Sequence, residues 1–283
     1  MAQKSRYLPA ESEVSAKMSK ADLNRLASLH SKKGRRKEEL FLAEGVRLLE
    51  EALRHHRLPK RVFLYPPDIN ERAQALVESF RSKSVPTETI SSRDFHRLVE
   101  TKSPQGLLGV FELPSMDFNI NKASSAKRIL LVENINDPGN LGALLRSALG
   151  FGFDLTLLVG DCVEPFNAKV VRSTAGAVFG CRLMECNIEE LQSLIENSGL
   201  RLFVTDLEGE PEARWFAEDS NDVAPKAVAI AVGAESIGAS PELRELAYRK
   251  ISIVHSPLLE SLNAGIAGSI VMHRLYLNDA LSE

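Results

Sequence analysis

The chain has 283 residues, of which 44% are hydrophobic and 26% charged, and its formal net charge is −3. This composition argues against a disordered chain, and the length exceeds the ~100–200 residues of one usual domain, so we expect two. No apolar run approaches the ~18 residues of a membrane-spanning helix, and the first residues lack the apolar core of a secretory signal. We therefore expect a cytoplasmic protein; an organellar presequence is the alternative, which Glu11 and Glu13 argue against.

The first part of the chain alternates between helical and strand-like patterns. We expect a flexible basic extension over residues 1–19 and a compact α/β domain over 20–113. Its predicted elements are a helix, the short strand FLAEG and a second helix within 20–54, the strand RVFLY, the helix ERAQALVESF, the strand SVPTETI, the helix SRDFHRLVE and the strand GLLGVFEL.

Basic residues gather near the start of this domain. The cluster consists of Lys32, Lys33, Arg35, Arg36 and Lys37. Such a cluster is the electrostatic footprint expected of contacts with phosphate groups. A solvated charged face is the alternative that these residues alone leave open.

A polar segment without periodicity at 114–127 predicts a linker, and a second domain follows over 128–283. Its predicted strands are mostly continuous apolar runs, which favours a parallel sheet covered on both faces in a doubly wound α/β domain. The expected strands are 128–135, 154–160, 201–207, 227–235 and 250–256, and the expected helices are 139–150, 167–174, 187–198, 240–247 and 261–281.

The three cysteines, Cys162, Cys181 and Cys186, are odd in number and show neither CxxC spacing nor a nearby histidine. We expect reduced thiols and no metal site.

In an open parallel sheet, ligands bind beyond the carboxyl ends of the strands. After the strand 128–135, Pro138 and Gly139 favour a turn, and Asn140 can cap the helix that follows. Arg146 falls on the second turn of this helix among apolar neighbours. A capped helix whose arginine reaches solvent is the plainer alternative.

The second unusual place follows the strand AVAIAV, where Gly233, Glu235 and Gly238 lie within GAESIG. Glycine permits a positive φ and a close backbone approach, and the segment matches neither GxGxxG nor a P-loop. Glu235 stands at a buried strand end and needs a partner, for which Arg146 or a polar ligand would serve. A plain β-turn is the alternative.

The third place joins the strand KISIVHS to the last helix. Ser261 is a natural N-cap, and small residues follow it at Ala264, Gly265, Ala267 and Gly268. Small residues let another backbone come close, as in tight helix packing or a knot crossing. Helix capping alone is the alternative.

Taken in this order, the three places resemble the three motifs of the SpoU (TrmH-like) branch of the SPOUT methyltransferases. The matching positions are Asn140, Leu141, Gly142, Arg146 and Ala148, then Gly233, Glu235 and Gly238, and then Ile253, Glu260, Ser261, Leu262 and Asn263. The segment KVVRSTAG at 169–176 is similar to the family's segment before its third strand. LAEGVRLLEEAL at 42–53 is similar to the substrate-binding domain of many rRNA methyltransferases in this group.

The resemblance implies a trefoil-knotted catalytic domain, a homodimer, and methyl transfer from S-adenosylmethionine to a ribose 2′-hydroxyl of RNA. Large-subunit rRNA is the expected substrate and tRNA the alternative. The resemblance assigns catalytic roles to Arg146, Asn140, Glu235, Ser261 and Asn263. It assigns donor contacts to Thr205, Asp206, Gly233, Ile253 and Leu262. It assigns contacts with RNA to the five residues of the basic cluster and to Arg172.

The chain departs from the family at Val254-His255, where Pro-Met is usual, and at Pro257, where glycine is usual. Proline lacks an N–H and fixes φ, so a backbone contact with the donor can be lost there. A guanidinium stays protonated at neutral pH, so we expect Arg146 to hold a phosphate or the developing oxyanion. His255 is the alternative base.

Two competing functions can be told apart. An RNA-binding protein that keeps the fold but has lost its donor site through His255 and Pro257 would not bind S-adenosylmethionine. A dehydrogenase would carry a glycine-rich turn after its first strand, which Pro138-Gly139-Asn140 does not provide.

Overall fold

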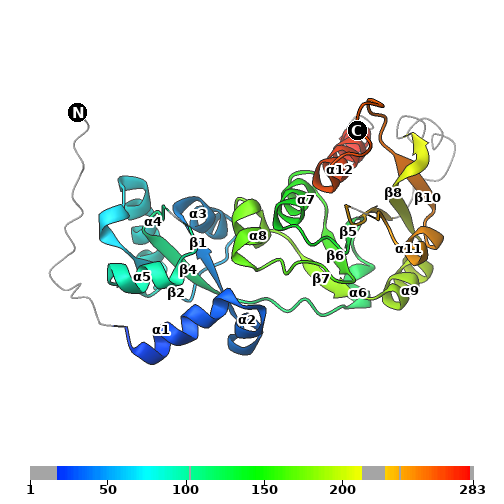
Figure 1. Cartoon of the computed structure of the whole chain (residues 1–283). Helices are drawn as coiled ribbons and strands as arrows, with labels where there is room; N and C mark the ends of the chain where they lie inside the picture. Colours follow the sequence, from blue (N-terminus) through cyan, green and yellow to red (C-terminus); the bar gives the residue numbers. More distant parts are fainter. Residues whose placement is uncertain (1–17, 102, 212–226, 236, 281–283) are drawn as a thin grey trace. The chain divides into compact units, whose positions relative to one another are not determined.

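The computed structural model describes residues 18–101, 103–211, 227–235 and 237–280 (Figure 1). The chain divides into two compact units, one formed by Met1–Pro114 with Phe166–Gly180 and the other by Ser115–Pro165 with Cys181–Glu283. The basic extension expected over 1–19 lies outside the described residues except for its last two.

A four-stranded mixed sheet with the order β1-β4-β2-β3 forms the centre of the first unit. β4 runs antiparallel to β1 and β2, and β2 runs parallel to β3. The strands are β1 (Leu40–Glu44), β2 (Arg61–Leu64), β3 (Thr87–Thr89) and β4 (Leu107–Glu112). The helices are α1 (Lys20–Ala27), η1 (Ser28–His30), α2 (Lys32–Glu38), α3 (Val46–Arg54), η2 (Pro66–Asp68), α4 (Glu71–Ser82), α5 (Ser92–Leu98), α8 (Ala168–Ser173) and η3 (Ala177–Phe179).

Side-chain caps fix where several of these helices begin. Ser19 Oγ accepts a hydrogen bond from the backbone N–H of Asp22 at 3.0 Å and so caps α1. Ser31, Asn70 and Ser91 cap α2, α4 and α5 in the same way. A cap of this kind typically stabilises a helix by about 1 kcal/mol.

Aromatic packing brings residues 166–180 into the first unit. Phe41 on β1 contacts Phe166 and Phe179, with ring centroids 4.8 and 6.0 Å apart. Phe111 on β4 contacts Phe179 at 4.8 Å. Aromatic pairs at these distances contribute beyond the apolar area that they bury, which accounts for the place of this distant segment.

The second unit contains a six-stranded sheet with the order β10-β8-β9-β5-β6-β7, in which every pairing is parallel. The α/β class and the parallel sheet expected from the apolar runs are confirmed. The strands are β5 (Arg128–Glu133), β6 (Leu155–Val159), β7 (Leu183–Cys186), β8 (Leu200–Pro211), β9 (Ala227–Val232) and β10 (Arg249–Ser252). The helices are α6 (Ile120–Ala123), α7 (Pro138–Gly150), α9 (Ile188–Ser198), α11 (Pro241–Glu245) and α12 (Ala264–Ala280).

Strand β7 was not anticipated from the sequence. It has four residues and lies at the sheet edge, where Glu185 is exposed to solvent. Because its apolar run is short and is interrupted by Glu185, the sequence pattern does not indicate a buried strand. The backbone N–H of Glu185 donates to the carbonyl of Met116 at 2.7 Å, so the start of the expected linker covers this edge.

The segment 114–127, expected as a linker, contains α6 and packs on the second unit. Ala123 and Ala126 are buried in its core, and Phe118 and Ile120 pack against the same core. The start of the second unit therefore lies earlier than the first strand of its sheet.

Helix α12 lies beside α7 (Figure 1). A Cβ on Gly268 would lie 2.4 Å from Cδ2 of Leu144, and Ser269 Oγ lies 2.7 Å from Ser147 Oγ. Tight helix packing, one of the two roles expected for the small residues, is confirmed. The trefoil knot stays a prediction.

No helix within the described ranges is both long and apolar enough to cross a membrane. The cytoplasmic location stays a prediction.

Candidate active site

The carboxyl ends of β5, β9, β8 and β10 lie next to one another in that order, because neighbouring strands are parallel. From β5 the chain continues outward to β6 and β7, whereas β9 and β8 lie on the other side of β5. Such a reversal of strand order is where open α/β sheets bind ligands. The three motifs singled out in the sequence follow β5, β9 and β10.

Helix α7 begins directly after the turn that follows β5. Asp137 Oδ1 accepts a hydrogen bond from the backbone N–H of Asn140 at 2.8 Å, and Pro138 occupies the first turn. The expectation that Asn140 caps this helix is therefore wrong, since Asp137 does so. The Asn140 side chain remains available for contacts with other loops, and the residue is buried.

Asn140 joins the loops that follow β9 and β10. Its Nδ2 donates to Glu235 Oε1, and its Oδ1 accepts a hydrogen bond from Asn263 Nδ2 at 2.8 Å. The structure thus brings together three of the five residues assigned to catalysis. Because both ends of the Asn140 amide are engaged, its orientation is fixed.

The loop between β9 and α11 closes on itself. The backbone N–H of Gly238 donates to the carbonyl of Ala234 at 2.9 Å. A Cβ on Gly233 would lie 2.3 Å from the backbone nitrogen of Ala239, and Gly238 has a φ of +69°. The first glycine therefore permits a close approach, and the second adopts the left-handed conformation that glycine favours.

Strand β8 leaves its ladder with β10 where Thr205 lies. Lys250 pairs with Val204, but the next residue of β10 pairs with Glu210. Residues 205–209 therefore bulge out of this ladder. Thr205 Oγ1 donates to the carbonyl of Ala231 on β9 at 3.0 Å, which holds the start of the bulge against the neighbouring strand.

Asp206 forms a close ion pair with Arg244 on α11. Asp206 Oδ2 lies 3.2 Å from Arg244 Nε, and the aspartate side chain is only 4% exposed. Although the charges are close, neither of these two atoms forms a hydrogen bond with any residue in the part of the chain that the structure describes. Asp206 Oδ2 therefore keeps unused acceptor capacity beside the predicted donor contacts.

The loop between β10 and α12 contains the remaining residues that are predicted to contact the methyl donor. Ile253 and Leu262 are half-buried, and His255 Nδ1 donates to the Ile253 carbonyl at 2.8 Å. The expectation that Ser261 caps the last helix is wrong, since Asn263 Oδ1 accepts the hydrogen bond from the backbone N–H of Ile266 at 3.2 Å. Ser261 is exposed.

Arg146 is exposed on α7. It forms no hydrogen bond or ion pair with any residue that the structure describes, so it is not the partner of Glu235; Asn140 takes that place. The guanidinium is therefore open to a ligand from solvent.

The basic cluster of the first unit divides into exposed and buried members. Lys32, Lys33, Arg36 and Lys37 are exposed. Arg35, however, is 2% exposed, and its Nη1 donates to the backbone carbonyls of Leu29 at 2.7 Å and His30 at 3.1 Å. Its assignment as an RNA contact is corrected, because this guanidinium closes the end of η1.

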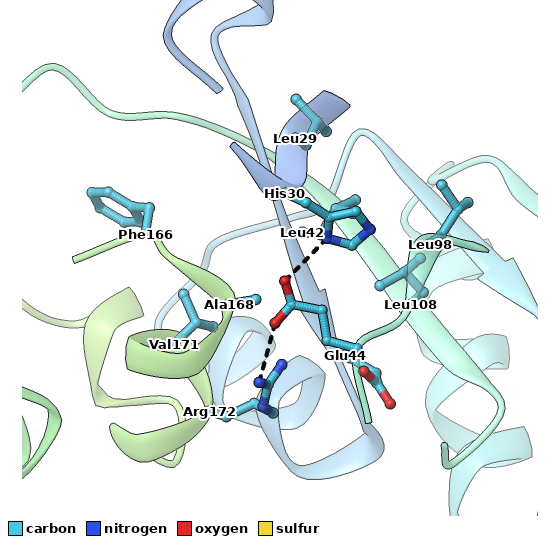
Figure 2. Close-up of a pocket in the computed structure, with 11 residues that line it drawn as sticks. Leu29, His30, Leu42, Glu44, Leu98, Leu108, Phe166, Ala168, Val171 and Arg172 are labelled. Carbon is cyan, nitrogen blue, oxygen red and sulfur yellow. Dashed lines mark hydrogen bonds and ion pairs between the residues drawn. The ribbon is translucent and has the colours of Figure 1, made fainter. Parts of the chain in front are cut away.

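Arg172 takes part in a charged cluster inside the first unit (Figure 2). Its Nη2 lies 3.3 Å from Glu100 Oε2, and His30 Nδ1 lies 3.2 Å from Glu100 Oε1. The cluster borders a small, mostly apolar cavity. Arg172 is half-buried, and its role as an RNA contact stays a prediction.

Glu133 is a residue that sequence reasoning missed. It ends β5, is 3% exposed, and accepts hydrogen bonds from the backbone N–H and the hydroxyl of Ser240 at 2.8 and 2.6 Å. An acid that ends an apolar strand beside the predicted site is the signal that could have found it, as it did for Glu235.

The three cysteines are free. Burial raises the pKa of Cys181 and of Cys186 to about 12, so both remain protonated thiols at neutral pH. Within the described ranges, no three His, Cys, Asp or Glu side chains gather as they would to hold a metal ion.

Residues 127–273 match the SpoU rRNA Methylase family, and residues 20–109 match the MRM3-like substrate binding domain. The chain is 26% identical to the 23S rRNA (guanosine(2553)-2′-O)-methyltransferase RlmP of Bacillus subtilis over 87% of this chain and 92% of that protein. It is similar in structure to an AdoMet-bound rRNA methyltransferase from Sinorhizobium meliloti, with a TM-score of 0.77, 23% identity, and coverage of 93% of this chain and 96% of that one. A crystal structure of an RNA 2′-O ribose methyltransferase is similar as well, with a TM-score of 0.77, 25% identity, and coverage of 93% and 97%.

The second unit is a doubly wound domain in which three motif loops converge at the switch point, and a region similar to a substrate-binding domain precedes it in the chain. These features define the class of protein as an RNA methyltransferase. The chain belongs to the SpoU rRNA Methylase family, whose match covers more than half of its length.

Proposed function

We propose that this protein transfers a methyl group from S-adenosylmethionine to a ribose 2′-hydroxyl of large-subunit rRNA. The hydrogen-bonded contact of Asn140 with Glu235 and Asn263 is the observation that carries the proposal, because it unites the three motif loops at one edge of the sheet. The similarity to RlmP, whose name specifies 23S rRNA and a 2′-oxygen, supports the substrate class.

The residues at this edge fit the methyl donor. Asp206 Oδ2 is ion-paired with Arg244 but has no hydrogen-bond partner among the described residues, so this carboxylate keeps an acceptor for a polar or cationic group of the ligand. The closed loop at Gly233 presents backbone rather than side chain. The donor would be held by Thr205, Asp206, Gly233, Ile253 and Leu262. When bound, it supplies an electrophilic methyl group on its sulfonium.

The protein's own groups then position the acceptor. Arg146 is exposed and open to solvent on α7, so its guanidinium can hold the phosphate next to the target ribose and stabilise charge that develops on the 2′-oxygen. The hydroxyl proton passes to that phosphate or to water. Correct alignment of the oxygen with the methyl group supplies much of the rate enhancement.

The first test is isothermal titration of the full-length protein with S-adenosylmethionine. We expect micromolar binding by the wild type and its loss in Leu262→Arg, because Leu262 is half-buried in the loop after β10. Leu58→Arg makes the same change at a side chain of the first unit that is already 45% exposed, and should bind normally. No binding by the wild type, even with RNA present, would favour an RNA-binding protein without activity.

The second test separates chemistry from donor binding. Transfer of a labelled methyl group to ribosomal RNA should fall strongly in Arg146→Ala while donor affinity stays unchanged. Arg274→Ala removes an exposed arginine from α12 and should keep full activity. Parallel reactions with bulk tRNA distinguish the alternative substrate.

We also propose that the protein is a homodimer. Val254, Leu258 and Leu259 in the loop after β10 are strongly exposed, as is Ile266 on α12. Several large apolar side chains exposed within one short stretch of chain are typical of association surfaces. Light scattering of the wild type should give twice the mass of one chain. Leu258→Glu should reduce the measured mass to that of a single chain.

A further inference from the structure

The loop that the proposed donor would contact is tied to the sheet by a buried carboxylate. Glu133, at the end of β5, accepts two hydrogen bonds from Ser240, one from the backbone N–H at Oε2 and one from the hydroxyl at Oε1. A carboxylate as buried as this one is costly unless it is fully hydrogen-bonded. The two hydrogen bonds therefore join Glu133 directly to Ser240.

Ser240 connects this carboxylate to the loop after β9. Its hydroxyl oxygen also accepts a hydrogen bond from the backbone N–H of Leu243 at 3.2 Å, so Ser240 caps α11. The loop runs from Gly233 to Ser240 and is closed by the bridge between Ala234 and Gly238. The far end of the loop is therefore held to β5, although β9 is the strand from which it departs.

A second contact holds the middle of the same loop. Asn140, in the first turn of α7, donates to Glu235. Glu133 ends β5 and Asn140 lies in the first turn of α7, so the two sides of one short connection hold the loop at two points. Only one of the two contacts involves a residue that is predicted to act in catalysis. Glu235 is such a residue, whereas Ser240, which follows Gly238 in the sequence, is not.

We infer that Glu133 is a positioning residue for donor binding: it acts through Ser240 to keep the backbone of residues 233–235 and 237–240 in the conformation that receives S-adenosylmethionine. This inference rests on the proposed function. Glu133 does not itself touch the donor. Its loss should loosen the loop and weaken donor affinity without removing any group that contacts RNA or the reacting atoms.

The test compares Glu133→Gln, Ser240→Ala, the double variant and Ser240→Thr by titration of the full-length protein with S-adenosylmethionine. Each of the first two should raise the donor Kd on the order of ten-fold, as expected for the loss of a hydrogen bond to a charged group. The double variant should lose clearly less than the sum of the two single losses, because both changes weaken the same link between Glu133 and Ser240. Ser240→Thr keeps the hydroxyl and the N–H and should restore affinity.

Further readouts separate positioning from mere loss of folded protein. A misfolded fraction lowers the binding stoichiometry and kcat, whereas a loosened loop raises Kd and the donor KM at unchanged stoichiometry. Affinity for RNA should not change. Glu242→Gln makes the same substitution at an exposed glutamate on α11 and should leave donor affinity as in the wild type. If Glu133→Gln does not fold, the donor affinity of Ser240→Ala tests the inference by itself. This variant keeps the hydrogen bond from the backbone N–H of residue 240 to Glu133 and is therefore expected to fold.

Unchanged donor affinity in a folded Glu133→Gln or Ser240→Ala variant, or additive losses in the double variant, overturns the inference and leaves the proposed function standing. Absence of donor binding by the wild type overturns both.

Discussion

The side-chain amides of Asn140 and Asn263 are joined by a hydrogen bond of 2.8 Å across 123 positions of sequence. The same Asn140 amide donates to Glu235, and Asn263 Oδ1 accepts the hydrogen bond from the backbone N–H of Ile266 that caps α12. A continuous chain of hydrogen bonds therefore runs from the last helix through α7 to the glycine loop. Asn263 and Asn140 each accept one hydrogen bond and donate the next, so replacing the donating amide group of Asn140 by an acceptor should break the chain.

Asn140→Asp tests this chain. Aspartate can still accept from Asn263, but it cannot donate to Glu235, and it brings two carboxylates together. We expect a loss of about 1–3 kcal/mol in the free energy of unfolding, measured by urea denaturation at neutral pH. The loss should shrink in acid, where one carboxyl takes up a proton. Asn197→Asp, on the exposed face of α9, serves as the control; equal losses in both variants would contradict the argument.

Gly268→Ala tests the close packing of α12. The added Cβ would lie 2.4 Å from Leu144 Cδ2 and 2.8 Å from Val232 Cγ2, both on fully buried residues that have little room to move. We expect destabilisation of about 1–3 kcal/mol from overpacking. Gly150→Ala is the matched control, since no atom of the described residues lies within 4 Å of a Cβ there, and it should stabilise α7 by up to about 1 kcal/mol. Thermal unfolding compares the two, and a neutral Gly268→Ala would show that the two helices can separate.

The sequence predicted the parallel sheet because its strands are unbroken apolar runs, and it predicted which loops converge because parallel strands end at one edge. It could not choose between cap residues that stand close together. Ser261 and Asn263 are both good N-caps, and Asp137 stands three residues before Asn140. The choice depends on contacts between loops that are far apart in the sequence: Asn140 is engaged with Glu235 and Asn263, whereas Asn263 caps α12 with its Oδ1 and contacts Asn140 with its Nδ2.

Buried charge was also hard to predict. Arg35 lies between other basic residues that are exposed, and only its distance to the carbonyls of η1 reveals that it stabilises the fold. Glu133 ends an apolar strand, yet its partner Ser240 lies 107 positions away. Local patterns report which face is apolar, whereas the pairing of single charges depends on tertiary contacts.

Lys32→Gln and Lys33→Gln together should weaken binding to ribosomal RNA. Both lysines are exposed on α2, and each phosphate contact that is lost should lower the slope of log affinity against log salt concentration by about 1. Filter binding over a series of salt concentrations measures both quantities. Lys83→Gln removes an exposed lysine at the end of α4 and serves as the control. An unchanged salt slope would show that this part of α2 is only a solvated charged face.

The cysteines should react slowly with a thiol reagent in the folded protein. Burial raises the pKa of Cys181 and of Cys186 to about 12, so the reactive thiolate is scarce at neutral pH. Burial also raises the pKa of Cys162, whose Sγ lies 3.4 Å from the carbonyls of Val132 and Val159. Ellman's reagent should count all three thiols at once after unfolding in guanidinium. A rapid reaction of any of them without denaturant would contradict the raised pKa values of these thiols.

Asp22→Asn should destabilise the first unit in a pH-dependent way. Burial alone would raise the pKa of the Asp22 carboxyl, but hydrogen bonds from Arg61 and Arg25 outweigh it, and the pKa lies below its ordinary value. The stabilisation is therefore fully present above the unfolded pKa of about 3.9 and is lost as the pH falls through the lower, folded value. Calorimetry of the full chain should show wild type more stable than the variant by about 1 kcal/mol at neutral pH, with the gap closing in acid. Asp68→Asn, at an exposed aspartate of the same unit, serves as the control. A stability gap between wild type and Asp22→Asn that stays constant with pH would rule out the ion pair as its cause.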